Sequence, residues 1–385
     1  MSIKRFYVRL FVALTFIGGV SACGDEDTTP ESNVEVNSPD PFTLGAYGVG
    51  QVTFEDGNAL EYTSELDGVQ RTLRLVAWYP TDDTRGESPL FQREDVFLDA
   101  GVSMVEETYP VLIYSHGTKG FAEDSYMLME RYASHGFIVV ALDHMGDTTA
   151  NRDDQRTTEM YAWRSLDISA IIDWLTDPAE QHIFSGKVDD RFALTGHSYG
   201  GYTTFLSGGA AFNDDAFADC RQGVSNAFCS TMTPEYEARM KEGFRDQRLR
   251  AIIPIAAGNS YELGPQGVAN IEIPTMMITG GLDKNCSEER HGDPYWAALN
   301  GEEDIRVQLT TAGHHTFTLT CEFFAGLGQN DNGCTDANIE PELGQNLTAA
   351  YVLAFAWKHL NDSTQYEALL DGSLSLDDSV VIYRK

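Results

Sequence analysis

The sequence predicts an α/β domain with a mainly parallel central sheet and helices on both of its faces, and three observations support this. From residue 41 onward, short apolar runs alternate with segments of helical periodicity. Two runs, 111–114 and 137–142, are continuously apolar, which is typical of strands buried on both faces. A glycine-rich turn at 196–201 directly follows the apolar run 192–195, as expected where a strand passes sharply into a helix.

The remaining elements follow in chain order. Residues 48–54 and 72–79 predict antiparallel lead-in strands, because both are rich in valine, leucine and aromatic residues and are separated by polar turns. The runs 111–114 and 137–142 should form the sheet centre, and apolar residues at helical spacing predict a helix over 164–175. Further buried strands are expected at 192–195, 251–255, 275–279 and 305–309, and a closing helix at 347–360.

Residues 206–246 interrupt this alternation. The stretch is polar, partly helical and contains two cysteines, so it predicts an insertion near the functional site. We therefore expect a single domain over 41–385 that carries this insertion.

The chain of 385 residues is strongly acidic. It has 26 lysine and arginine residues against 59 aspartate and glutamate residues, a formal net charge of −33. Such a surface repels a phosphate backbone, which argues against nucleic acid as a partner. With 42% hydrophobic residues, the chain has the composition of a globular protein rather than of a disordered or fibrous one.

The N-terminus is typical of an export signal. Residues 1–22 combine a cationic start with an apolar run, 10–20, that is too short to span a bilayer. Residues 20–23, Val-Ser-Ala-Cys, resemble the lipobox of bacterial lipoproteins, which implies cleavage before Cys23 and acylation of that residue. The polar segment 23–40 would then be a solvated tether.

These features predict an exported bacterial lipoprotein. Its lipid would anchor it to the outer membrane or the cell surface, and a periplasmic location is also open. An ordinary signal peptide followed by an incidental cysteine is the alternative.

Five cysteines lie beyond the N-terminal segment, and an exported chain meets oxidising conditions. Short spacing favours the disulfides Cys220–Cys229 and Cys321–Cys334 and leaves Cys286 as a free thiol. Spacing alone also allows Cys286 to pair with either member of the second pair. No two cysteines have the two-residue spacing of a zinc knuckle, so we expect no metal site.

One motif carries a chemical signal. A serine hydroxyl becomes a nucleophile when a base lies within hydrogen-bond reach, an acid orients that base, and N–H donors await the oxyanion. The segment Gly-His-Ser-Tyr-Gly at 196–200 directly follows a predicted strand, and this Gly-x-Ser-x-Gly turn is typical of a nucleophile elbow. Ser198 is therefore the candidate nucleophile.

The acid and the base should follow Ser198 in that order, each just beyond a strand. Asp283 follows the expected strand 275–279, and His314 follows the expected strand 305–309. His315 is the competing base. We prefer His314 because it comes directly after a small Ala-Gly turn.

The oxyanion hole should combine two backbone N–H groups. One belongs to Tyr199, the residue after the nucleophile, and the other to the loop 115–121 after the strand 111–114. In that loop we choose the N–H of Thr118. On the expected helix 164–175, Arg164 and Asp167 are three residues apart and are expected to pair with each other.

Together these motifs resemble the α/β-hydrolase superfamily, and within it the bacterial relatives of platelet-activating-factor acetylhydrolase and of dienelactone hydrolase. The resemblance covers about 41–360, and its most specific stretches are 76–80, 114–117, 133–140 and 196–201. It implies an α/β-hydrolase fold and a serine esterase of short-acyl esters, including acetylated phospholipid-like esters. It also implies that no metal or organic cofactor is needed.

The resemblance is incomplete at the acid. In the acetylhydrolases the acid follows the strand after the nucleophile helix, here 251–255, where the first carboxylate is Glu262. Asp283 instead matches the position used by dienelactone hydrolases and by cutinase-like polyester hydrolases. The sequence therefore supports the catalytic residues better than it supports a phospholipid substrate.

Three alternatives stay open. The first is a cutinase-like polyester or aromatic-ester hydrolase. The second is a non-catalytic lipoprotein that binds an apolar ligand in a hydrolase-shaped pocket. The third is a peptidase, since a Ser-His-Asp triad does not choose between amides and esters. The expected partners are a small-molecule or lipid ester and a membrane reached through the lipid on Cys23.

Overall fold

A computed structural model describes residues 40–89, 95–321 and 332–385. The expected export signal 1–22, the expected acylation site Cys23 and all but the last residue of the expected tether lie outside the described residues.

The chain forms two units, Met1–Asn37 and Ser38–Lys385, and every described residue belongs to the second unit. Within those described residues, no helix combines the length and the apolar character that a membrane crossing needs.

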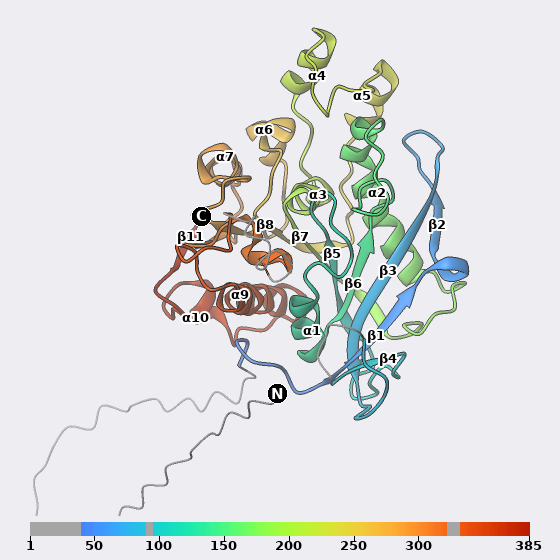
Figure 1. The fold of residues 1–385 in the computed structure, drawn as a ribbon, viewed down its shortest axis with the longest axis vertical. Coiled ribbons are helices and arrows are strands. Elements are labelled where there is room, and N and C mark those ends of the chain that lie inside the picture. Colours follow the sequence, from blue (N-terminus) through green and yellow to red (C-terminus); the bar gives the residue numbers. More distant parts are fainter. Residues whose placement is uncertain (1–39, 90–94, 322–331) are drawn as a thin grey trace, which may run out of the picture. The chain divides into compact units, whose positions relative to one another are not determined.

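A sheet of eleven strands lies at the centre of the second unit (Figure 1). The strands are β1 (Gly48–Phe54), β2 (Leu60–Thr63), β3 (Gln70–Thr81), β4 (Val96–Leu98), β5 (Tyr109–Ser115), β6 (Ile138–Asp143), β7 (Val188–His197), β8 (Leu249–Ile255), β9 (Met276–Gly280), β10 (Ile305–Leu309) and β11 (Val380–Arg384). Their order across the sheet is β11-β10-β9-β8-β7-β5-β6-β3-β1-β4, and β2 pairs with β3.

The middle of the sheet is parallel, and most pairs toward its margins are antiparallel, although the edge strand β4 is parallel to β1. All neighbouring pairs from β10 through β8, β7 and β5 to β6 are parallel. In contrast, β3 is antiparallel to β6, β1 and β2, and β11 is antiparallel to β10. Every residue of β5 is buried, as expected for a parallel strand with helices on both sides.

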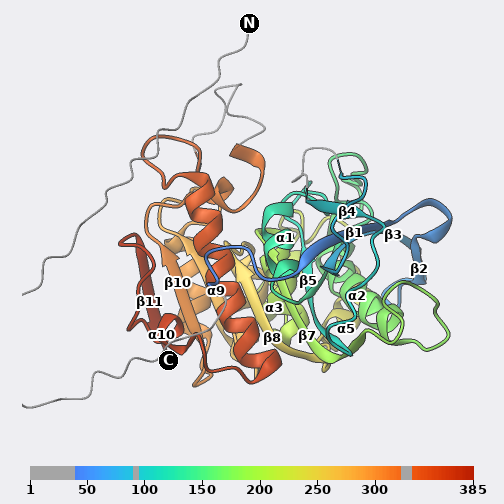
Figure 2. The same cartoon turned by 90° about the horizontal axis from the view of Figure 1, so that it is seen from below.

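Helices cover both faces of the sheet. They are α1 (Tyr126–Ser134), α2 (Thr157–Thr176), α3 (Tyr199–Gly208), α4 (Asp214–Arg221), α5 (Pro234–Met240), α6 (Ser260–Val268), α7 (Asp293–Ala298), α9 (Pro341–Asn361) and α10 (Glu367–Leu370), with short turns η1 (Asp56–Asn58), η2 (Glu288–Gly292) and η3 (His314–Phe317). Along β5, Val111 and Ile113 face the core under α2 and α3, whereas Leu112 and Tyr114 face the core under α1 and α9. The view from below shows α9 and α1 on the same side of the sheet (Figure 2).

The expected α/β fold class is confirmed. Every strand and helix that the sequence predicted overlaps an observed one, and α2 begins at Thr157, earlier than the expected start at residue 164. Three strands were not predicted: β2, β4 and β11. They are short strands near the margins of the sheet. Each forms by pairing with the edge of another strand, and no local sequence pattern predicts such pairing.

The expected insertion 206–246 completes α3 and then forms α4 and α5, which lie above α3 in Figure 1. It packs against the first turns of α2. The Thr158 hydroxyl donates to the Phe228 carbonyl oxygen at 2.8 Å, and the Tyr161 ring meets the Phe228 ring edge-on at 5.1 Å. These contacts explain why α2 extends further toward its N-terminus than its apolar spacing indicates.

Candidate active site

Ser198 lies on a sharp turn between β7 and α3. Its backbone has φ 58° and ψ −114°, in the region that favours glycine, so the turn is strained. The backbone N–H of Ser198 donates to the Ile255 carbonyl oxygen at 2.9 Å. A Cβ at Gly200 would lie 1.8 Å from the Ser115 carbonyl oxygen, and one at Gly196 would lie 2.7 Å from the same atom. The two glycines are therefore required by the close approach of β5.

The structure brings the three candidate catalytic side chains into one chain of hydrogen bonds. His314 Nε2 lies 3.0 Å from Ser198 Oγ, and His314 Nδ1 lies 2.7 Å from Asp283 Oδ2. The other carboxylate oxygen, Oδ1, accepts the backbone N–H groups of Asn285 and Cys286, each at 2.7 Å. A carboxylate is an acceptor, so the proton belongs on Nδ1, and Nε2 is left to accept from the serine hydroxyl.

His314 is held by the segment that follows residue 331. Its backbone N–H donates to Asn332 Oδ1 at 3.1 Å, and the same oxygen accepts the N–H of Lys284 at 2.9 Å, beside Asp283. The N–H of His315 donates to the Asn332 carbonyl oxygen at 2.9 Å. Asn332 thus joins the segments that carry the base and the acid. Asn332 was not predicted from the sequence, because it lies 18 residues beyond His314 and no local pattern marks it.

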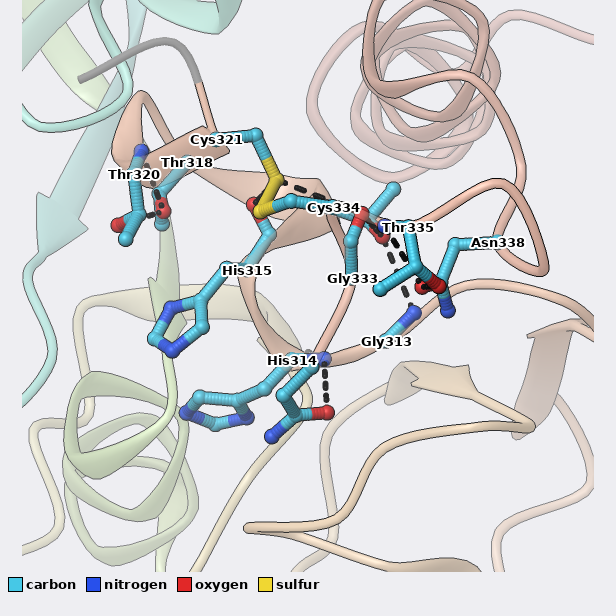
Figure 3. Close-up of a disulfide and its surroundings, with 12 residues drawn as sticks. Gly313, His314, His315, Thr318, Thr320, Cys321, Gly333, Cys334, Thr335 and Asn338 are labelled. Carbon is cyan, nitrogen blue, oxygen red and sulfur yellow. Dashed lines mark hydrogen bonds between the residues drawn. A yellow bond between two sulfur atoms is a disulfide. The ribbon is translucent and has the colours of Figure 1, made fainter. Parts of the chain in front are cut away.

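A disulfide secures this segment. Cys321 and Cys334 are bonded, and Figure 3 shows them next to the turn that carries His314 and His315. Cys321 Sγ lies 3.5 Å from the His315 carbonyl oxygen. The expected pairs Cys220–Cys229 and Cys321–Cys334 are both confirmed, and Cys286 is a free thiol.

The two competing candidates take no part in these hydrogen bonds. The side chain of His315 has no hydrogen bond to Ser198 or Asp283 in the described part of the chain. Burial and the neighbouring His314 lower the pKa of His315 to about 4, so it is neutral at neutral pH. Glu262, the other candidate acid, likewise makes no hydrogen bond to His314 among the described residues.

The two candidate oxyanion donors are available. The backbone N–H groups of Tyr199 and Thr118 donate no hydrogen bond to any residue that the structure describes. The loop that carries Thr118 passes close to the nucleophile, because a Cβ at Gly117 would lie 3.2 Å from Ser198 Cβ. Both N–H groups are therefore free to bind an oxygen that approaches Ser198.

A cavity of about 710 Å³ opens beside Ser198 and His314. It is lined by Gly117, Thr118, Lys119, Gly120, Phe121, Asp124, Asp143, Thr148, Thr149, Ala150, His197, Asn285, His315, Thr318, Leu319 and Thr320. None of the described residues in the insertion 206–246 lines it. The insertion packs on the start of α2 and does not form the wall of this cavity.

The expected pairing of Arg164 with Asp167 is also wrong. Arg164 pairs with Asp147 at 2.6 Å, whereas Asp167 pairs with Arg71 at 2.6 Å and with His144 at 2.8 Å. Both side chains are buried and reach different neighbours, so their spacing on one helix does not decide their partners.

Cys286 lies close to the acid and the base. One ligand atom from each of Asp283, Cys286 and His314 lies within 4.8 Å of the others, which is close enough to share a metal ion. However, both ring nitrogens of His314 already have hydrogen-bond partners, and burial raises the pKa of the Cys286 thiol to about 12. The donors fit the triad hydrogen bonds better than a metal site, which needs a thiolate and a free imidazole nitrogen.

Comparison with known proteins gives three findings. A family model described as Chlorophyllase matches residues 101–213. The sequence is 32% identical to cutinase est2 of Thermobifida alba over 214 residues, which are 55% of this chain and 55% of that protein. It is 24% identical to cutinase est1 of the same organism over 214 residues, which are 55% of this chain and 56% of that protein. The chain thus spans about half the length of these relatives.

Among solved structures, a ferulic acid esterase from Streptomyces cinnamoneus superposes with a TM-score of 0.63. It is 19% identical in sequence, and the match covers 91% of this chain and 99% of that chain. The fold is therefore an α/β-hydrolase fold. In sequence the chain is related to carboxylic ester hydrolases, namely the cutinases above. These similarities concern cutinases and a chlorophyllase family model.

Proposed function

We propose that the protein is a serine carboxylic ester hydrolase. The observation that carries this proposal is the unbroken chain of hydrogen bonds from Asp283 through His314 to Ser198 at the wall of an open cavity. The similarity to cutinases supports the same chemistry. Acyl transfer needs a nucleophile, a base, an acid that orients the base, and donors for the oxyanion. Candidates for all four lie within this one site.

In the first half-reaction, Ser198 Oγ attacks the ester carbonyl carbon while His314 Nε2 takes the hydroxyl proton. Asp283 keeps the proton on Nδ1 and stabilises the imidazolium that forms. The carbonyl oxygen becomes an oxyanion and accepts the N–H groups of Tyr199 and Thr118. The tetrahedral intermediate then collapses, and His314 gives its proton to the departing alcohol. Ser198 is left acylated.

In the second half-reaction, water takes the place of the alcohol. His314 Nε2 accepts a proton from that water, and the hydroxide attacks the acyl carbonyl carbon. The same two N–H groups bind the second oxyanion. When this intermediate collapses, His314 returns the proton to Ser198 Oγ, and the carboxylic acid is released. The neutral state of His315 avoids a second positive charge beside the imidazolium.

For the substrate, we infer an ester with an aromatic or polyester acyl group. The relatives reported above are cutinases, and a solved structure with the same fold is a ferulic acid esterase. The cavity wall agrees with this inference, since it combines Phe121 and Leu319 with several threonines. The narrower reading, a short-acyl or acetylated phospholipid-like ester, has only the sequence resemblance behind it and ranks second.

Hydrolysis of nitrophenyl acetate, butyrate and octanoate, of methyl ferulate and of a polyester film by the purified protein tests this proposal. We expect turnover that disappears in Ser198→Ala, with faster cleavage of the aromatic or polymeric esters than of the acetate. A preference for acetate would favour the short-acyl reading. Turnover that survives Ser198→Ala would contradict Ser198 as the nucleophile. No turnover in folded wild-type protein would contradict the esterase proposal and favour a binding protein.

Ser207→Ala is a matched control. Ser207 lies on α3, the same helix that Ser198 precedes, and its buried hydroxyl has no hydrogen-bond partner in the described residues. It does not line the cavity. The control variant should therefore keep the wild-type rate, which separates loss of the nucleophile from damage to the helix.

For the location, we propose a lipoprotein anchored through Cys23, on the sequence alone. Cys23→Ala should move the protein from the membrane fraction to the soluble fraction of the producing bacterium. Mass spectrometry of the mature N-terminus checks the acylation. An unmodified N-terminus at another residue would favour an ordinary signal peptide.

A further inference from the structure

A buried guanidinium lies beneath the two candidate oxyanion donors. Arg164, in the middle of α2, is 0% exposed. Its Nη2 donates to the carbonyl oxygen of His116 and, at 3.2 Å, to Ser115 Oγ. Its Nη1 donates to Asp147 Oδ2 at 2.6 Å, and its Nε donates to Thr203 Oγ1 at 3.1 Å. All three nitrogens of the guanidinium therefore have acceptors.

Two of these acceptors belong to the segment that leads into Thr118, one of the two candidate oxyanion donors. Ser115 ends β5, and His116 lies two residues before Thr118. The ring of His116 also binds this loop, because its Nδ1 lies 2.6 Å from the Gly117 carbonyl oxygen. The bond from Arg164 to the His116 carbonyl sets the plane of the peptide that leads into Gly117. The direction of the next N–H groups depends on that plane.

The guanidinium of Arg164 also contacts Tyr199, the other candidate oxyanion donor. Arg164 Cζ lies 4.6 Å from the centre of the Tyr199 ring, within the range of a cation–π contact. Thr203 accepts from Arg164 Nε and donates to the Tyr199 carbonyl oxygen at 3.0 Å. One side chain thus contacts both the loop of Thr118 and the first residue of α3.

The charges around Arg164 are compensated by buried partners. Asp147 is 1% exposed and also pairs with Arg152. Ser115 Oγ, a second acceptor of Arg164, lies 2.8 Å from His144 Nε2. Buried ion pairs add little net stability, because removing the charges from water offsets their attraction. Stability alone therefore does not account for placing this network under the loop.

We propose that Arg164 is a positioning residue for the oxyanion hole. It holds the peptide after His116 and the start of α3 in one relative orientation, so that the N–H groups of Thr118 and Tyr199 point at the same oxygen. Oxyanion stabilisation depends on donors that are oriented before the reaction begins. This inference rests on the proposed function, because it assigns no new reaction to the site.

The test uses a fluorophosphonate, which labels a reactive serine without a known substrate. Intact mass follows labelling of the full chain, and kcat and KM for a nitrophenyl ester are measured in parallel. In Arg164→Met we expect both labelling and kcat to fall by about 10² to 10³, the loss typical of one oxyanion donor. We expect KM to change by less than about threefold, because the donors act on the transition state.

Two further variants keep the test independent of folding. Arg164→Lys retains the charge but not the planar fork, so we expect a smaller loss of about tenfold. Thr203→Val removes the link to the Tyr199 carbonyl, and we expect a loss of about three- to tenfold. Arg306→Met is the matched control, because Arg306 is also buried, is paired with Glu288 and lies over the Tyr383 ring, yet does not line the cavity.

The outcomes are separable. If Arg164→Met loses thermal stability as Arg306→Met does but is labelled within about threefold of the wild-type rate, Arg164 is structural and the proposal is overturned. A higher KM at unchanged kcat overturns it too, since that pattern reports ground-state binding. If the wild type is not labelled at Ser198, both the esterase proposal and this inference fail. If the wild type is labelled and only the Arg164 result fails, the esterase proposal stands.

Discussion

Replacing Asp283 with asparagine tests the candidate triad in depth. In the wild type, Oδ1 accepts the backbone N–H groups of Asn285 and Cys286, and Oδ2 accepts from His314 Nδ1. The two N–H donors hold the oxygen of an asparagine amide on their own side, so its NH2 group faces His314. Two donors then oppose each other unless the imidazole moves its proton to Nε2. In that tautomer, the nitrogen beside Ser198 can no longer accept the serine proton.

The magnitude follows from this change of tautomer. The same substitution in a serine protease triad lowers kcat about 10⁴-fold, and the contacts of Asp283 predict a similar loss. Four decades in rate correspond to about 5.4 kcal/mol of transition-state stabilisation. We expect KM to stay within a few-fold of the wild-type value, because Asp283 is buried behind His314 and does not line the cavity.

The assay is kcat/KM for a nitrophenyl ester, with thermal unfolding to verify that each variant is folded. Glu262→Gln is the matched control, since Glu262 is the carboxylate that follows β8 and does not contact His314 in the described residues. It should keep a rate near that of the wild type. If Asp283→Asn stays within about tenfold of the wild-type rate while Glu262→Gln collapses, the assignment of the acid is refuted.

Three other predictions concern the support of the site. Gly200→Ala should destabilise the fold by about 3 kcal/mol or more in urea unfolding, because its Cβ would lie 1.8 Å from the Ser115 carbonyl oxygen. If this variant keeps wild-type stability and activity, the turn tolerates a Cβ. Replacing both Cys321 and Cys334 with serine should cost about 3 kcal/mol, as expected for a loop with a sequence separation of 13, and an unchanged unfolding midpoint would contradict this. Burial and Arg164 lower the pKa of His144 to about 3, so it is neutral in the folded state at a pH where the unfolded chain is protonated. Stability should therefore fall as the pH drops from about 6.5 toward 4, by up to about 1.4 kcal/mol per pH unit, and His144→Gln should flatten that slope in urea titrations at pH 7, 6 and 5.

Local sequence patterns were sufficient to predict those features of the structure that depend on neighbouring residues alone. The strand-turn-helix segment around Ser198 needs small residues on either side of the serine, and that need is visible in the sequence. The continuous apolar run of β5 follows from its burial on both faces. The two disulfides join cysteines 9 and 13 residues apart, so short spacing was a sound guide.

Other features depend on contacts between distant segments. Arg164 and Asp167 are neighbours on α2, yet their partners, Asp147 and Arg71, come from other parts of the chain. Asn332 accepts from the backbone N–H of His314 although it lies 18 residues further along the chain. No helical spacing or motif encodes such partners, because they depend on which side chains the packed sheet brings within hydrogen-bond distance.

The sequence by itself determined the α/β class and the order of the candidate nucleophile, acid and base, because each leaves a local trace in apolar periodicity or glycine placement. Short spacing favoured the two disulfides, and the structure decided that Cys286 is the free thiol. Only the tertiary structure decided that the insertion 206–246 packs on α2 rather than over the cavity beside Ser198. It also decided that Arg164 turns toward the loop of Thr118. The physical reason is that a buried polar group takes whichever partners surround it in the closed core, and those partners come from segments far apart in the chain.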